Sequence, residues 1–158
     1  MMTNLVRVPI FVLRLAIGWV FFYAGWTKVI TYFTDAKDWT AAGFLGRLEG
    51  PFTQLFSSMA GNTIVDQLNA WGLLLVGIAI ILGILVRWAA FWGIVLMVLY
   101  WAAGFPPENS FIIDDHIIYS LVFIVLAAIG AGRIWGIDKL IEKSSLVRSN
   151  TWLLKLLG

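Results

Sequence analysis

Four stretches of the chain, each close to the length of a membrane-spanning helix, contain almost no charged side chain. They cover residues 8–33, 68–86, 88–105 and 112–132. A helix needs about 20 mostly apolar residues to cross roughly 30 Å of hydrocarbon. Because the runs are continuous rather than alternating, they are not strands of a membrane barrel. The sequence therefore predicts an all-α integral membrane protein, a four-helix transmembrane bundle that forms one domain over residues 1–158.

The composition excludes several classes of protein. The chain is 61% hydrophobic and 13% charged, whereas soluble domains are about 25% charged. Its net charge of +2 is too small for a nucleic-acid-binding surface. The absence of cysteine excludes disulfides, iron–sulfur clusters and thiolate zinc sites within this chain. With one histidine, His116, the sequence predicts neither a bis-His haem nor a metal site.

The distribution of basic residues predicts the topology. Eight of them fall on one side of the four predicted spans and three on the other. The larger set is Arg7, Arg14, Arg87, Arg133, Lys139, Lys143, Arg148 and Lys155, and the smaller is Lys28, Lys37 and Arg47. By the positive-inside rule, we expect a multi-pass protein of the cell membrane with both termini in the cytoplasm. The first run is too long for a signal peptide, so we expect it to remain as the first helix.

The connections between the predicted spans are unequal. A long first outer loop, roughly residues 34–67, contains several glycines, and residues 52–59 follow the apolar spacing of a short interfacial helix. The second and third spans meet at a very short turn around Arg87. In the cytoplasmic tail, residues 133–158, apolar residues alternate with charged ones such as Asp138. We therefore expect the tail to be amphipathic and to lie on the anionic inner leaflet.

One face of the first span carries both of its charges and two glycines. Spacings of three and four residues bring together Arg14, Gly18, Phe21, Gly25 and Lys28. Small residues at such spacing let a second helix approach closely, and Gly72, Gly77 and Gly83 of the second span are the expected partners. For Arg14 we favour an anchor that reaches the inner interface over a buried ion pair. Lys28 is expected to pair with Asp115 or Asp66.

Several short motifs follow one another in a recognisable order. They are Arg14-Leu-x-x-Gly18, Phe22-x-x-Gly25-x-x-Lys28, the stretch from Trp71-Gly72 to Arg87, Asp115-His116, and Gly130-Ala-Gly-Arg133 with Gly136-Ile-Asp138. In this order they resemble the DoxX family of small four-helix membrane proteins, over about residues 7 to 141. That family includes the DoxD-type subunit of thiosulfate:quinone oxidoreductase. The resemblance implies a membrane subunit that passes electrons from an extracytoplasmic donor, such as thiosulfate, to quinone.

The candidate site lies at the predicted outer ends of the first and fourth spans. Histidine is the side chain whose unperturbed pKa lies nearest neutrality, so His116 is the expected proton exchanger. Asp115 would relay protons from water, and Lys28 would donate a hydrogen bond to a quinone carbonyl. The candidate quinone-binding residues are Tyr119, Tyr100, Trp26 and Arg14. Each candidate has a structural alternative, since Asp114 and Asp115 are typical helix caps and His116 can be a hydrogen-bonded core histidine.

Other functions fit the same residues. The main alternative is a non-catalytic membrane scaffold that recruits a partner through its outer loop, since the chain has no redox centre of its own. A transporter is less favoured, because no inverted repeat or broken helix is evident. Whether the chain is a quinone-linked subunit or a scaffold, we expect it to contact lipid and to assemble with a second subunit or as a homo-oligomer. Many members of the resembled family have no assigned activity, and a fold does not fix a function.

The topology can be tested with single cysteines, because the natural chain has none. Ser57→Cys lies in the predicted outer loop and Ser149→Cys in the predicted cytoplasmic tail. In intact cells, an impermeant thiol reagent should label Ser57→Cys and leave Ser149→Cys unmodified until the membrane is opened. The reverse labelling pattern would contradict the predicted orientation.

Overall fold

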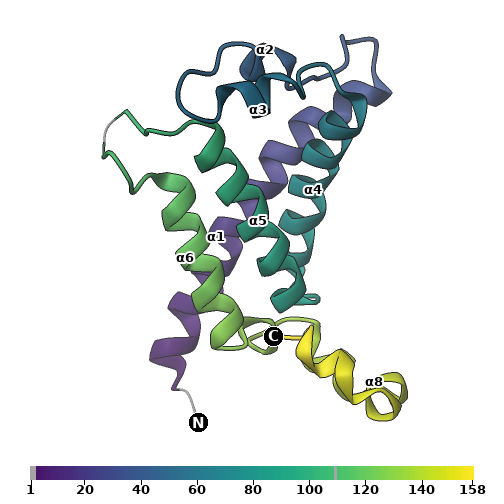
Figure 1. The fold of residues 1–158 in the computed structure, drawn as a ribbon. Helices are drawn as coiled ribbons and strands as arrows, with labels where there is room; N and C mark the ends of the chain where they lie inside the picture. The colour runs from purple at the N-terminus through teal and green to yellow at the C-terminus, as the bar shows by residue number, and fades with distance from the viewer. Residues whose placement is uncertain (1–2, 109) are drawn as a thin grey trace.

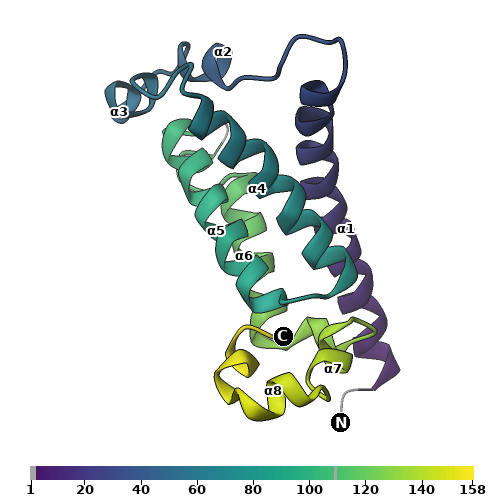
Figure 2. The same ribbon diagram turned by 90° about the vertical axis from the view of Figure 1, so that its right-hand side faces the viewer.

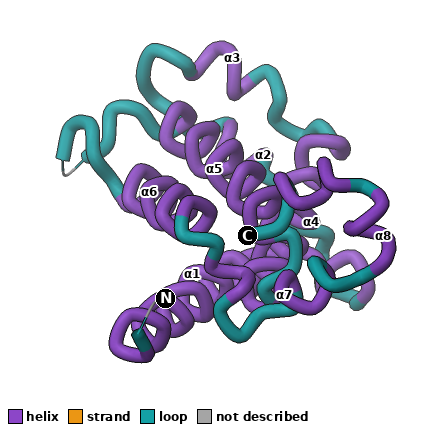
Figure 3. Tube along the Cα trace, turned by 90° about the horizontal axis from the view of Figure 1, so that it is seen from below, coloured by secondary structure: helices purple, strands orange, loops and turns teal. Residues whose placement is uncertain are grey.

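The long helices run side by side and form a bundle with a layer of shorter segments at each end (Figure 1). In this computed structural model, residues 3–108 and 110–158 are described, without the side chains of Leu146 and Arg148. The predicted cytoplasmic residue Arg148 therefore has no described side chain. The bundle helices are α1 (Asn4–Val29), α4 (Thr63–Leu82), α5 (Val86–Ala103) and α6 (Asp115–Ala128). All regular structure in the described residues is helical, as Figure 3 shows.

The two ends of the bundle differ. Residues 34–62, here called the cover segment, lie across one end and include α2 (Ala42–Leu45) and α3 (Thr53–Ser57). Both termini lie at the other end, together with α7 (Asp138–Ile141), α8 (Ser145–Ser149) and the 3-10 helix η3 (Thr151–Lys155) (Figures 1 and 2). We call these the loop end and the tail end.

Three of the four predicted spans are helices long and apolar enough to cross a membrane. They are α1 continued by the 3-10 turn Ile30–Phe33, then α4 and α5. The fourth differs from its predicted bounds of 112–132, because α6 has 14 residues. Asp114 caps its start by accepting a hydrogen bond from the Ile117 N–H at 3.1 Å. Its other end is fixed where Gly130 turns into the left-handed region at φ +67°.

Helices α1 and α4 touch through glycines, as predicted. A Cβ added at Gly25 would lie 2.5 Å from the Cα of Leu74, and one at Gly77 would lie 2.5 Å from the Cα of Phe22. The two backbones are therefore in direct contact, and the surrounding core buries Phe21 completely. Two other predicted partners lie elsewhere. Gly72 faces α5, and Gly83 lies in the turn after α4.

That turn connects α4 and α5 at residues 83–85, not at Arg87, which lies inside α5. Asp138 reaches it from the tail and accepts hydrogen bonds from Leu85 N–H at 2.7 Å and Val86 N–H at 3.1 Å. The Asp138 carboxylate thus caps the start of α5, where the helix dipole favours negative charge. The prediction that Asp138 lies on a polar tail surface is wrong, because its side chain is fully buried.

The tail folds back beneath the bundle instead of lying on its surface as one amphipathic element (Figure 3). Val147 and Leu157 are buried, whereas Leu140, which the alternating pattern places on the apolar face, is exposed. The Gly158 N–H donates to Asp138 at 2.9 Å. The buried Asp138 carboxylate therefore ties the final residue to the α4–α5 turn.

Arg14 is buried at the same end, with 1% of its side chain exposed. Its Nη1 donates to the carbonyls of Ala131 at 2.5 Å and Ile134 at 2.8 Å, and its Nη2 donates to that of Trp135 at 3.4 Å. The predicted interfacial anchor is therefore wrong. The guanidinium thus binds the carbonyls of the segment that follows α6, and it shares the Ala131 carbonyl with the Ile134 N–H.

The cover segment has a small core of its own, formed by Ala41, Leu45 and Phe56 against Ala103 of α5. The predicted helix over residues 52–59 is present as the shorter α3. Asp66 in the first turn of α4 accepts a hydrogen bond from the Ala41 N–H at 2.8 Å. This buried contact fixes the segment over the loop end.

The contact between α1 and α4 predicts how glycine substitutions behave. Gly77→Ala should destabilise the protein by about 1–3 kcal/mol, because its methyl group would overlap the Phe22 backbone and force the helices apart. Gly43→Ala is the matched control, since a Cβ there meets no atom within 4 Å. Thermal unfolding of both variants in mild detergent measures the difference. Equal melting temperatures would show that the two helices do not depend on this contact.

Candidate functional site

A cavity of about 540 Å³ opens at the loop end, where the four bundle helices meet the cover segment. Its lining comes from all five of these elements: Lys28, Trp39, Thr40, Ala41, Phe44, Asn69, Tyr100, Gly104, Asp114 and His116. We call it the loop-end cavity. Three predicted site residues, Lys28, Tyr100 and His116, line it together although they come from three different helices.

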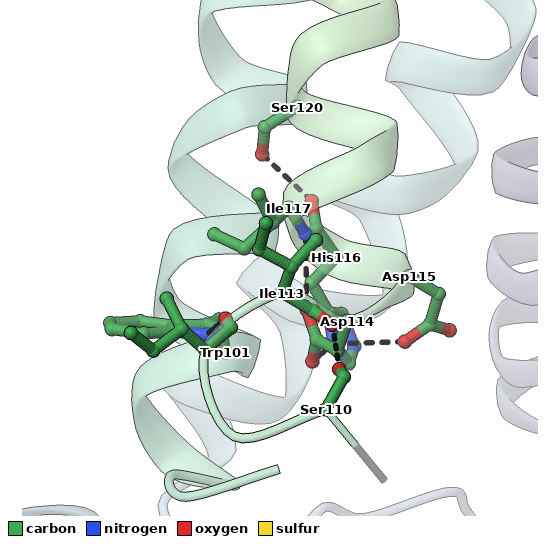
Figure 4. Close-up of polar contacts among 9 residues, drawn as sticks. Trp101, Ser110, Ile113, Asp114, Asp115, His116, Ile117 and Ser120 are labelled. Atoms are coloured by element: carbon green, nitrogen blue, oxygen red, sulfur yellow. Dashed lines mark hydrogen bonds and ion pairs between the residues drawn. The ribbon is translucent and has the colours of Figure 1, made fainter.

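His116 lies between two carboxylates at the start of α6 (Figure 4). Its Nδ1 is 2.7 Å from Asp114 Oδ2 and 3.4 Å from Asp115 Oδ1. Burial disfavours the charged form of Asp114, but hydrogen bonds from His116 and the Ile117 N–H outweigh this and hold the pKa of Asp114 below its usual value. With Nδ1 donating to Asp114, the Nε2 atom is the ring nitrogen that this contact does not use.

Lys28 has a different environment from the predicted one. Its Nζ donates to the carbonyl of Ala24 at 2.9 Å and lies 5.1 Å from the ring centre of Trp39. The prediction of an ion pair with Asp115 or Asp66 is wrong, because Lys28 forms no ion pair within the described part of the chain. An ammonium group has three N–H donors, so two remain after the bond to Ala24.

Tyr100 and Asn69 form the polar part of the wall contributed by α5 and α4. The Tyr100 ring packs edge-on against His116 with 5.7 Å between the ring centres. Its hydroxyl interacts with the Asn69 side chain. Asn69 Oδ1 is buried and has no hydrogen-bond partner among the described residues. A buried acceptor of this kind is costly to leave unpaired, so it fits a ligand that carries a donor.

The other predicted site residues lie outside this cavity. Asp115 has 65% of its side chain exposed and lines a neighbouring acidic hollow of about 340 Å³ with Glu108 and Asp114. Tyr119 turns toward Phe21, 6.5 Å away between ring centres. Trp26 stacks on Phe22 at the surface of α1. Arg14 is committed to the carbonyls at the tail end.

Seven lining residues were not among the predicted site residues: Trp39, Thr40, Ala41, Phe44, Asn69, Gly104 and Asp114. The sequence does indicate that Asn69 could belong to a site, because it is an amide inside an otherwise apolar run. Asp114 was predicted as a helix cap, which it is, and its contact with His116 gives it a second role. Trp39 and Phe44 belong to the cover segment, where no periodicity indicates which side chains turn inward.

Asp114, Asp115 and His116 also bring potential ligand atoms within 4.8 Å of one another. Hydrogen bonding and helix capping account for the position of Asp114. These contacts explain the arrangement without a metal ion, and the absence of a metal stays a prediction from the sequence.

The DoxX family model matches residues 10–105, more than half of the chain. The match runs from α1 to the end of α5 and includes the cavity residues Lys28, Trp39, Phe44, Asn69 and Tyr100. Asp114 and His116 follow the matched region. No solved structure matches the chain.

The depressed pKa of Asp114 predicts a pH-dependent contribution to stability. A carboxyl whose pKa is lower in the folded protein stabilises the fold above its ordinary value of 3.8, and this stabilisation is lost as the pH falls through the lower folded value. Asp114→Asn should therefore melt below the wild type at pH 6, and the gap should close toward pH 3. Asp35→Asn, at an exposed position of the cover segment, is the control. A gap that is the same at every pH would contradict the assignment.

Proposed function

We propose that this protein, which belongs to the DoxX family of membrane proteins, binds a quinone headgroup in its loop-end cavity as a subunit of a quinone-linked oxidoreductase. The observation that carries the proposal is the set of unused hydrogen-bonding groups in one cavity. Lys28 has two N–H groups to donate, and Asn69 Oδ1 is a buried acceptor without a partner among the described residues. The rings of Trp39 and Phe44 complete the lining.

These groups suit both states of the ligand. A quinone, when bound, accepts two electrons and two protons at its two carbonyl oxygens. Lys28 would donate to a carbonyl oxygen, and Asn69 would accept from a hydroxyl after reduction. His116 Nε2 would hold and transfer the proton, while Asp114 orients the imidazole and stabilises its protonated form.

The electrons must come from outside this chain, because it has no cysteine and too few histidines for a redox centre. The resemblance to the DoxD-type subunit suggests thiosulfate as the donor. Two thiosulfate ions release two electrons when they form one tetrathionate ion, which balances the reduction of one quinone. The exposed Asp115 would then pass protons from water to His116, whose Nδ1 lies 3.4 Å away.

The proposal includes four membrane crossings with both termini in the cytoplasm. Both termini lie at one end of the bundle (Figure 1), as an even number of crossings requires. We propose that α6, extended by the segments on either side, makes the fourth crossing. The excess of basic residues at the tail end supports an orientation with that end in the cytoplasm and the cavity at the outer face.

A second function is favoured by one observation. The cover segment exposes Phe44, Phe52 and Leu55, a set of apolar side chains suited to contact with another protein. In this function the chain is a scaffold that recruits a partner at the outer face. The partner would be a second subunit or another copy of this chain.

Two tyrosines allow a matched test of quinone binding. Tyr100→Phe removes a hydroxyl from the cavity, whereas Tyr119→Phe removes one that lies outside it. We propose that the Tyr100 hydroxyl also donates to the quinone. Loss of this hydrogen bond, about 1 kcal/mol, should weaken binding roughly fivefold for Tyr100→Phe and leave Tyr119→Phe at wild-type affinity. Titration of the purified protein with a short-chain quinone, followed by tryptophan fluorescence, measures the affinities.

Equal affinities for the two variants would show that the quinone does not bind in the loop-end cavity. Co-purification of a stoichiometric protein partner, with no quinone binding by the wild type, would favour the scaffold function.

A further inference from the structure

A second polar cavity, of about 340 Å³, lies at the tail end, on the opposite side of the bundle from the proposed quinone site. We call it the tail-end pocket. It is formed by the start of α1, the segment that follows α6, and α7 and the residue after it. Its polar side chains are Arg7, Arg133, Lys139 and Glu142.

The charges in this pocket do not balance. Three cations face one carboxylate, and Glu142 is already bound to Arg133 at 2.5 Å. No hydrogen bond or ion pair of the Arg7 or Lys139 side chain is found within residues 3–108 and 110–158. Two cations therefore converge on one cavity without a counter-ion from the described protein. This arrangement fits an anion.

Arg133 is held in a fixed position beside them. Its Nε donates to Glu142, and its side chain folds over Gly130. A Cβ at Gly130 would lie 2.8 Å from Nη1 of Arg133, so the position of the guanidinium depends on this residue having no side chain. The Nη groups remain available, and a planar guanidinium is well suited to phosphate oxygens.

The surroundings indicate what carries the phosphate. The surface of α1 around Arg7 exposes Leu5, Val8 and Val12, and Trp135 on the pocket wall has 56% of its surface exposed. An exposed tryptophan beside basic residues and an apolar helix surface is typical of the headgroup level of a bilayer. A lipid can satisfy both parts of this site, with its phosphate in the pocket and its acyl chains along α1. A soluble phosphate ion would satisfy only the first.

We propose that the tail-end pocket binds the headgroup phosphate of an anionic phospholipid, through Arg7, Arg133 and Lys139. This site is independent of the proposed quinone function, because none of its residues lines the loop-end cavity. The bound lipid would supply the negative charge that Arg7 and Lys139 lack.

The test uses the full chain, purified in mild detergent and mixed with equal amounts of phosphatidylglycerol and phosphatidylcholine. Native mass spectrometry then counts the lipids retained. The wild type should retain phosphatidylglycerol in preference. The double variant Arg7→Gln/Lys139→Gln should lower that preference roughly tenfold, because each basic residue near an anionic headgroup contributes substantially to binding. Neither side chain has a partner in the described structure, so helicity and melting temperature should stay unchanged.

The matched control is Lys143→Gln/Lys155→Gln, which removes the same charge from tail residues outside the pocket. It should keep the wild-type preference within about twofold. Equal losses in both double variants would overturn the proposal, since they would show a general attraction to the basic tail. Loss of phosphatidylglycerol on addition of excess inorganic phosphate would also overturn it, in favour of a soluble anion. A wild type without lipid preference would overturn it as well.

Discussion

A backbone N–H or C=O without a partner costs several kcal/mol in hydrocarbon, and this cost governs how the bundle is closed. Within a helix the backbone groups bond to one another, so unpaired groups arise where a helix ends and the chain turns. At the tail end, two buried charged side chains form hydrogen bonds with such groups. Arg14 donates to three carbonyls beyond α6, and Asp138 accepts from amides at the start of α5 and near the end of the chain. The two opposite charges also attract each other. These contacts hold together the tight turn after α4, the segment after α6 and the returning tail.

The loop end is organised in the opposite way. The hydrogen bond from the Ala41 N–H to Asp66 fixes the cover segment to the bundle. The polar groups that face the loop-end cavity, in contrast, have hydrogen-bonding capacity left over. Lys28, Asn69 and His116 each keep hydrogen-bonding capacity that the described chain does not use. Buried polar groups that serve only the fold are normally satisfied by the fold. These unused groups are why we assign the quinone to the loop end, whereas Arg14 donates to three backbone carbonyls at the tail end and has no part in that site.

Much of this arrangement could be predicted from hydropathy and spacing. Long apolar runs gave α1, α4 and α5, and the glycine spacing of α1 gave its contact with α4. The same reasoning failed for Arg14 and Asp138, because local sequence does not show that the tail returns beneath the bundle to meet them. Hydropathy and spacing did predict that Lys28, Tyr100 and His116 lie in one region, since each is near the predicted outer end of an apolar run. The positions of Trp39 and Phe44 could not be predicted from the sequence, because the conformation of a loop follows from long-range contacts such as the one between Asp66 and Ala41.

For the fourth crossing that we propose, the shortness of α6 has a consequence for the membrane around the protein. At 1.5 Å per residue, its 14 residues span only about 21 Å, whereas the hydrocarbon layer is roughly 30 Å thick. A bilayer adapts to such a mismatch by thinning beside the short helix or by bringing proteins together along it. Where the bilayer thins, the boundary between water and hydrocarbon lies closer to the membrane centre along α6. His116 and Asp115, in the first turn of that helix, would then sit closer to the aqueous phase than the ends of α1 and α5 do, and a proton would reach them without a channel through the bundle.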